Sequence, residues 1–229
     1  MRRVLGRVAL FLAVVCVPVA AAAQVYVGPQ APKRGSIEVG GGGTYVPGFD
    51  MGGSTADLTT SSPTARFDLF TTESKVGPIQ GVHARVGYYL SRSLSLEASV
   101  RYAQPELSVE LSSDAESAAD ETATEKASHY LFGGSLLYDF RQASFAGGRG
   151  VPFVSGGAAY LRELHEGNLL VETGVEYHAT AGLKYWFGSG DNRFGLRFEA
   201  GLSARENGFD NEDGRRTQPV VAAGLSYLF

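Results

Sequence analysis

Hydrophobic and polar residues alternate with a period of two along most of the chain. The pattern is clear in residues 218–229, where one side of an extended backbone carries Val221, Ala223, Leu225, Tyr227 and Phe229. The other side carries mainly small residues. Alternation of this kind predicts a β-strand with one apolar face. A small inner side fits a crowded barrel interior, and aromatics at the end of the apolar side are typical of a membrane boundary.

The same alternation recurs in seven earlier segments. We expect strands at about 35–46, 79–90, 94–103, 130–141, 151–164, 172–187 and 193–205. The segment 193–205 alternates most cleanly, with Phe194 and Phe198 on one face and Arg197 on the other. The first segment contains a glycine run at 40–43, which weakens a strand but makes room for bulky neighbours in a narrow barrel.

The alternation does not decide which residues of segment 151–164 face outward. Phe153 and Leu161 could face outward with Arg162 inside, or Val154 and Tyr160 could face outward instead. The small residues at 155–159 between them favour neither arrangement.

The connections between these segments alternate in length, being long after the first, third, fifth and seventh and short after the others. Long loops on one side and short turns on the other are typical of transmembrane barrels. We therefore predict an all-β fold: an eight-stranded antiparallel up-and-down transmembrane β-barrel whose last strand closes on its first. The longest connections, 47–77 and 112–128, are rich in Gly, Ser, Thr or acidic residues, and we interpret them as mobile solvated loops. Strand extensions are predicted at 67–70 and 106–111.

Aromatic residues gather at both ends of the predicted strands. Near the short turns lie Tyr88, Tyr138, Phe140, Tyr185, Phe187, Phe194, Tyr227 and Phe229, and near the long connections lie Tyr45, Tyr102, Tyr130 and Tyr177. Two belts are what the two interfaces of a bilayer select.

Charged residues take the opposite phase to the apolar ones. They are Glu38, His83, Arg85, Glu97, Arg101, Asp139, Arg141, Glu176, Lys184, Arg197 and Glu199. In a closed barrel these groups share the interior. Eight strands leave a space that side chains just fill, so we predict a lumen closed by ion pairs and no open pore. In a soluble barrel the apolar residues would face the interior and the charged residues would face water. The two aromatic belts favour the opposite arrangement, with the apolar residues facing lipid.

The N-terminus has the organisation of a secretory signal peptide. Three arginines precede an apolar run at 8–19 that ends on Ala21-Ala22-Ala23, which predicts cleavage after residue 23 and export through the Sec pathway. Residues 24–34 form an extended lead-in, and 35–229 form the barrel domain.

Cleavage leaves 17 basic against 24 acidic residues and no cysteine, which excludes disulfides and gives no basic face for nucleic acid. Cys16 follows Val15, which disfavours lipoprotein processing.

The eight alternating segments, the sequence Pro152-Phe153 and the ending GLSYLF resemble the eight-stranded outer-membrane barrels of the OmpA and OmpX type. This resemblance implies a location in the bacterial outer membrane, contact with outer-membrane lipid and lipopolysaccharide, and Phe229 as a signal for the barrel-assembly machinery. OmpA itself carries a peptidoglycan-binding domain after its barrel, and we do not expect that role here. Such a pattern specifies architecture far better than activity.

Candidate chemistry is sparse. The sequence has no G-x-S-x-G or H-E-x-x-H motif, so we expect no catalytic residue and no cofactor. Eight-stranded barrel enzymes that modify outer-membrane lipid keep an enzyme as an alternative, with His165 the residue to test. Asp210, Glu212 and Asp213 before Gly214 do not meet the spacing of a calcium loop, so we expect no metal site.

The leading hypothesis is a non-enzymatic barrel with a structural or surface-interaction role and an unknown extracellular partner. The second alternative is a narrow channel or carrier for small hydrophobic molecules that resembles OmpW, with Tyr177 and its neighbours shaping a lateral opening.

Overall fold

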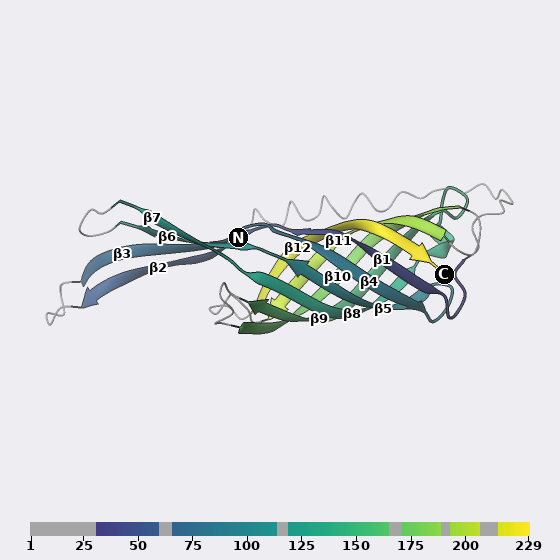
Figure 1. Ribbon diagram of the computed structural model, residues 1–229, viewed down its shortest axis with the longest axis horizontal. Helices are drawn as coiled ribbons and strands as arrows, with labels where there is room; N and C mark the ends of the chain where they lie inside the picture. Colours follow the sequence, from purple (N-terminus) through teal and green to yellow (C-terminus); the bar gives the residue numbers. More distant parts are fainter. Residues whose placement is uncertain (1–30, 60–65, 114–118, 165–170, 189–192, 207–214) are drawn as a thin grey trace, which may run out of the picture.

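Eight antiparallel strands close into a barrel (Figure 1). The computed structural model describes residues 31–229 except 60–65, 114–118, 165–170, 189–192 and 207–214. The barrel strands are β1 (Ile37–Val46), β4 (Ile79–Tyr89), β5 (Leu94–Ala103), β8 (Ser128–Asp139), β9 (Gly150–Leu164), β10 (Val171–Phe187), β11 (Arg193–Glu206) and β12 (Arg215–Leu228). Their order around the barrel is β1-β12-β11-β10-β9-β8-β5-β4. The predicted fold class is confirmed. Within these ranges, no helix is long and apolar enough to cross a membrane.

The last strand pairs with the first along its length. The register runs from Glu38 opposite Leu228 to Tyr45 opposite Val221. Gly40 lies where this seam meets the lumen, because a Cβ atom there would come within 2.9 Å of Arg85 Nε. The glycine therefore leaves room for the buried guanidinium, as expected for a narrow barrel.

A second, four-stranded sheet continues from one side of the barrel. It consists of β2 (Phe49–Thr59), β3 (Arg66–Val76), β6 (Glu106–Ser112) and β7 (Glu121–Lys126), in the order β2-β3-β6-β7. Figure 1 shows these strands projecting beyond the rim, each as the continuation of a barrel strand. The interpretation of 47–77 and 112–128 as mobile loops without packed structure was wrong for these parts. Each of these strands pairs with a neighbouring one, so its backbone N–H and C=O groups form hydrogen bonds within the sheet. In a solvated loop the same groups would bond to water.

The boundary between barrel and outer sheet follows a line of prolines. Pro47 lies between β1 and β2, Pro78 between β3 and β4, and Pro105 between β5 and β6. Proline has no N–H to donate to a ladder, so each one interrupts its strand at this level. Two backbone bonds span the line, from Gly77 N to Glu106 O at 2.8 Å and from Ala127 N to Pro105 O at 3.1 Å.

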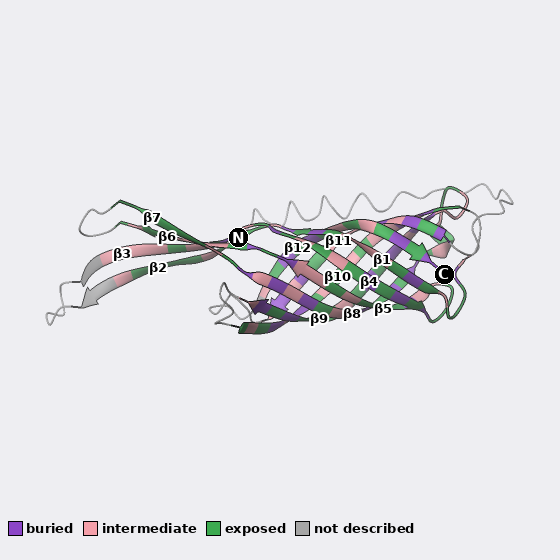
Figure 2. Ribbon diagram, viewed as in Figure 1, coloured by how far each residue is buried: buried purple, intermediate pink, exposed green. Residues whose placement is uncertain are grey.

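Buried and exposed residues alternate along the barrel strands (Figure 2), and the two surfaces of the barrel wall have opposite polarity. Val82, Leu96 and Phe132 are more than half exposed on the outside, whereas Glu38 and Lys184 are about 1% exposed inside. A band of exposed aliphatic and aromatic side chains is stable only next to lipid. The structure also resolves the phase of β9: Val154 and Tyr160 face outward, and Phe153 and Leu161 are buried inside.

This polarity inverts where the strands leave the barrel. On the outer sheet, the side that continues the barrel exterior carries ion pairs, between Lys75 and Glu73 at 3.3 Å and between Lys126 and Glu106 at 3.9 Å. The side that continues the interior carries apolar residues such as Leu107 and Val109. Because outward residues change from apolar to charged, the surrounding medium changes from lipid to water near the proline line.

Candidate functional site in the barrel lumen

The interior contains apolar residues at both ends. At the short-turn end, Tyr89, Val151, Trp186 and Leu228 form a buried cluster that we call the inner layer. At the other end, below the outer sheet, Val46, Val76, Ile79, Ala103 and Val220 form the outer layer, with Phe49, Met51 and Leu107 packed against it. Arg193 is buried beside the inner layer, with its guanidinium 5.8 Å from the centre of the Trp186 ring. Most other charged side chains of the lumen form three clusters.

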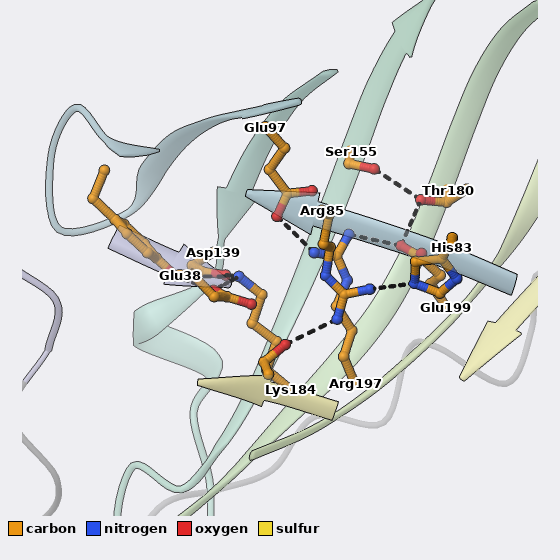
Figure 3. Close-up of polar contacts among 12 residues, drawn as sticks. Glu38, His83, Arg85, Glu97, Asp139, Ser155, Thr180, Lys184, Arg197 and Glu199 are labelled. Atoms are coloured by element: carbon orange, nitrogen blue, oxygen red, sulfur yellow. Dashed lines mark hydrogen bonds and ion pairs between the residues drawn. The ribbon is translucent and has the colours of Figure 1, made fainter. Parts of the chain in front are cut away.

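The inner charge cluster centres on Lys184 of β10. Its Nζ lies 2.8 Å from Glu38 Oε2 and 3.5 Å from Asp139 Oδ1. Tyr89 donates hydrogen bonds to both carboxylates, at 2.9 and 3.3 Å. Arg141 also donates to Asp139, at 2.8 Å. Four strands therefore contribute to one buried network, in which Figure 3 places Lys184 against Glu38 and Asp139.

The middle cluster centres on Arg197 of β11. Its two terminal nitrogens donate to Glu97 at 2.6 Å and to Glu199 at 2.8 Å. Arg85 lies beside it and contacts neutral groups, with Nη2 donating to Ser226 at 2.9 Å and Nη1 lying 2.7 Å from His83 Nε2 (Figure 3). A guanidinium can only donate, so Nε2 of His83 is the acceptor.

The outer cluster joins β5, β8, β9, β10 and β11. Glu176 lies between two arginines, 3.1 Å from Arg101 Nη1 and 3.1 Å from Arg205 Nε. Arg205 also lies 3.9 Å from Glu163, whose carboxylate is 3.6 Å from His129 Nδ1. Every carboxylate in this cluster thus has a cationic or imidazole neighbour.

The three clusters share a charge balance that makes each of them neutral. Each contains two carboxylates and two cations: Glu38 and Asp139 with Lys184 and Arg141, Glu97 and Glu199 with Arg197 and Arg85, and Glu163 and Glu176 with Arg101 and Arg205. Pairing offsets the large cost of removing these charges from water. An internal cavity of about 60 Å³ remains between the middle and outer clusters. It is large enough for one or two water molecules.

The structure places all nine predicted lumen residues on the interior face. Glu38, Arg85, Glu97, Asp139, Glu176, Lys184 and Arg197 are buried, while Arg101 and Glu199 are partly buried. Sequence reasoning missed Tyr89, Glu163 and His129 as members of these clusters, whereas the alternation of 193–205 places Arg205 on the inward face as observed. The phase could also have identified Tyr89, because it neighbours an outward residue, but Glu163 depended on the unresolved phase of 151–164.

The predicted interface aromatics lie on the outside of the barrel near the short turns. Tyr88, Tyr138, Phe187, Phe194, Tyr227 and Phe229 are exposed, and Tyr185 is half-buried. Several pack edge to face, with ring centroids 5.1 Å apart for Tyr138 and Phe140 and 4.7 Å apart for Tyr227 and Phe229. Phe187 and Phe194 stack with centroids 6.3 Å apart.

Other predicted features fall on parts of the chain whose placement is not described. The signal peptide at 1–23, most of the lead-in at 24–34, His165, and the acidic residues Asp210, Glu212 and Asp213 all lie outside the described residues. Among the described ranges, no group of three His, Cys, Asp or Glu side chains could hold a metal ion.

Comparison with known proteins identifies the fold. No protein-family model and no curated protein matches the chain. Among solved structures, the chain is similar to the outer membrane protein OprG from Pseudomonas aeruginosa, with a TM-score of 0.52 and 13% identity over 89% of this chain and 99% of that one. It is also similar to Neisserial surface protein A, with a TM-score of 0.47 and 15% identity over 84% of this chain and 97% of that one. The likeness to OprG shows that this chain has the fold of an outer-membrane β-barrel, whereas a specific relation to the OmpA and OmpX type is not established.

Proposed function

We propose that the protein is a non-enzymatic outer-membrane barrel with a closed lumen, which acts through its outer sheet at the cell surface. The observation that carries this proposal is the layered interior. An ion that enters from either end meets an apolar layer, Trp186 and Leu228 at one end and Val46 and Ile79 at the other. Between them, side chains that are paired with one another occupy the lumen.

Conductance in planar bilayers tests this proposal. The refolded chain is expected to give no large, stable ohmic steps, because both apolar layers and all three charge clusters would have to separate to admit hydrated ions. The inserted protein must show a heat-modifiable gel shift in the same preparation, so that an absence of conductance steps reflects a closed barrel rather than an unfolded chain. Large steps from heat-modifiable protein would overturn the closed lumen.

A carrier of small hydrophobic molecules is the second candidate. An apolar groove of about 1090 Å³ lies along the wall of β1 and β9–β12, lined by small outward residues such as Ala181, Ala200 and Ala223. Because these alanines face outward, acyl chains would occupy the groove in a bilayer, and we favour the first proposal. Saturable binding of a small hydrophobic probe that competes with lipid would favour the carrier.

We further propose two partners for this barrel. Phe229 is 59% exposed, and its N–H donates to Ile37 O at 2.8 Å across the closing seam. This position suits recognition of the C-terminal strand by the barrel-assembly machinery before closure. The second partner is lipopolysaccharide, the glycolipid that would surround the outer half of such a barrel.

A further inference from the structure

The outward residues near the proline line form rows whose polarity changes stepwise. The lowest row runs across four strands, with Val82 opposite Tyr102, Tyr102 opposite Tyr130, and Tyr130 opposite Arg162. The next row places Tyr45 opposite Gln80, and the register of β4 with β5 then brings Gln80 beside Gln104. Above them lies the pair of Glu106 and Lys126. From lipid to water, the wall therefore changes from aromatic to amide to charged.

The amide row lines a polar notch on the outside of the barrel. Its volume is about 320 Å³, and its walls are Gly77, Pro78, Gln80, Gln104, Glu106 and Lys126. A Cβ at Gly77 would lie 3.4 Å from Glu106 O, in ordinary van der Waals contact with the wall of the notch. Gln80 and Gln104 are exposed, so their amides are available both to donate and to accept hydrogen bonds.

Arg162 adds a cation at the level of the aromatic row. It is exposed on the outside of β9, although the neighbouring Leu161 and Glu163 are buried inside. Beside it, the rings of Tyr102 and Tyr130 pack with centroids 5.0 Å apart. Two strand spacings and a two-residue step along the strand separate Arg162 from Gln104, which together correspond to about 12 Å, within the reach of a short oligosaccharide. An outward arginine at a membrane interface is placed to contact a lipid phosphate.

We propose that this surface binds the head group of a phosphorylated glycolipid in the outer leaflet. The amides of Gln80 and Gln104 bind the sugar hydroxyls, Arg162 binds a phosphate, and the tyrosine pair contacts the base of the head group. The notch opens sideways from the barrel wall at the water interface, so its ligand arrives from the membrane. This inference rests on the proposed outer-membrane location and gives that location a specific lipid partner.

Binding of rough lipopolysaccharide, which has a short sugar core, tests the inference. The folded barrel is purified in detergent, titrated with this probe, and its bound fraction is counted by native mass spectrometry. Gln80→Ala with Gln104→Ala is expected to weaken binding about tenfold, because two hydrogen bonds are lost. Arg162→Gln should weaken binding of the phosphorylated probe but leave binding of dephosphorylated lipopolysaccharide unchanged, which separates the phosphate contact from the sugar contacts.

The matched control is Glu73→Gln with Lys75→Gln, which removes an exposed ion pair on the same face of the outer sheet without changing the net charge. It should bind like the unaltered chain. The glycolipid site would be overturned if the Gln80/Gln104 variant bound rough lipopolysaccharide as tightly as the unaltered chain. It would also be overturned if phosphatidylglycerol displaced the probe as effectively as rough lipopolysaccharide itself does. A heat-modifiable barrel that fails to bind rejects this inference alone, whereas absence from the outer-membrane fraction rejects the proposed function itself.

Discussion

Lys184 is the cation at the centre of the inner charge cluster. It is about 1% exposed and lies within 3.5 Å of two carboxylates, Glu38 and Asp139. Lys184→Met keeps much of the side-chain volume but leaves two buried carboxylates with one cation, Arg141. We expect the free energy of unfolding in lipid vesicles to fall by about 3 to 5 kcal/mol. Urea titration followed by tryptophan fluorescence and the gel shift measures this loss.

Two further variants separate charge from packing at this site. Adding Glu38→Gln to Lys184→Met removes the carboxylate that lost its partner, so we expect much of the stability to return. Lys75→Met is the control for an exposed pair, since Lys75 is half exposed beside Glu73, and its effect should stay below about 1 kcal/mol. If Lys184→Met and Lys75→Met cost the same, the buried network does not stabilise the barrel.

At the scale of single elements, the outer sheet is separable from the barrel. The barrel strands β1 and β4 stay paired up to Val46 opposite Ile79, below the proline line. Replacing residues 53–73 and 109–123 with two-residue Asn-Gly turns joins positions that face one another, Gly52 with Ser74 and Ser108 with Thr124. The shortened chain retains Phe49, Met51 and Leu107, which pack on the outer layer. We expect a heat-modifiable barrel whose free energy of unfolding changes by less than about 1 kcal/mol. A chain that no longer folds would show that the sheet is needed to build the barrel.

The sequence predicted the barrel strands well because lipid on one side and charges on the other impose a strict alternation. The strand extensions predicted at 106–111 and 67–70 are confirmed as β6 and as part of β3. The sequence failed for β2, for β7 and for the rest of β3, where Gly, Ser, Thr and Glu give no clear alternation. No phase could be assigned to β9, because Ser155 and the small residues after it fit either side. The ion pairs within the lumen could not be predicted from the sequence, because partners such as Lys184 and Glu38 are 146 positions apart.

At the scale of the whole molecule, the inversion of polarity at the proline line locates the membrane surface. Two outward positions provide a matched test: Val86 on the barrel is 51% exposed, and the side chain of Lys75 on the outer sheet is 50% exposed. Their accessibility in the isolated chain is the same, so only a bilayer can distinguish them. The two positions are changed singly to cysteine, each in a Cys16→Ser background.

We expect a membrane-impermeant maleimide added to intact cells to label Lys75→Cys readily and Val86→Cys at least tenfold more slowly. Lipid covers Val86, and a thiol reacts only as a hydrated thiolate. After extraction into urea both cysteines should react at similar rates, which controls for intrinsic reactivity. Rapid labelling of both positions in intact cells would place water on the apolar wall, and then neither a membrane location nor a glycolipid at the notch could stand.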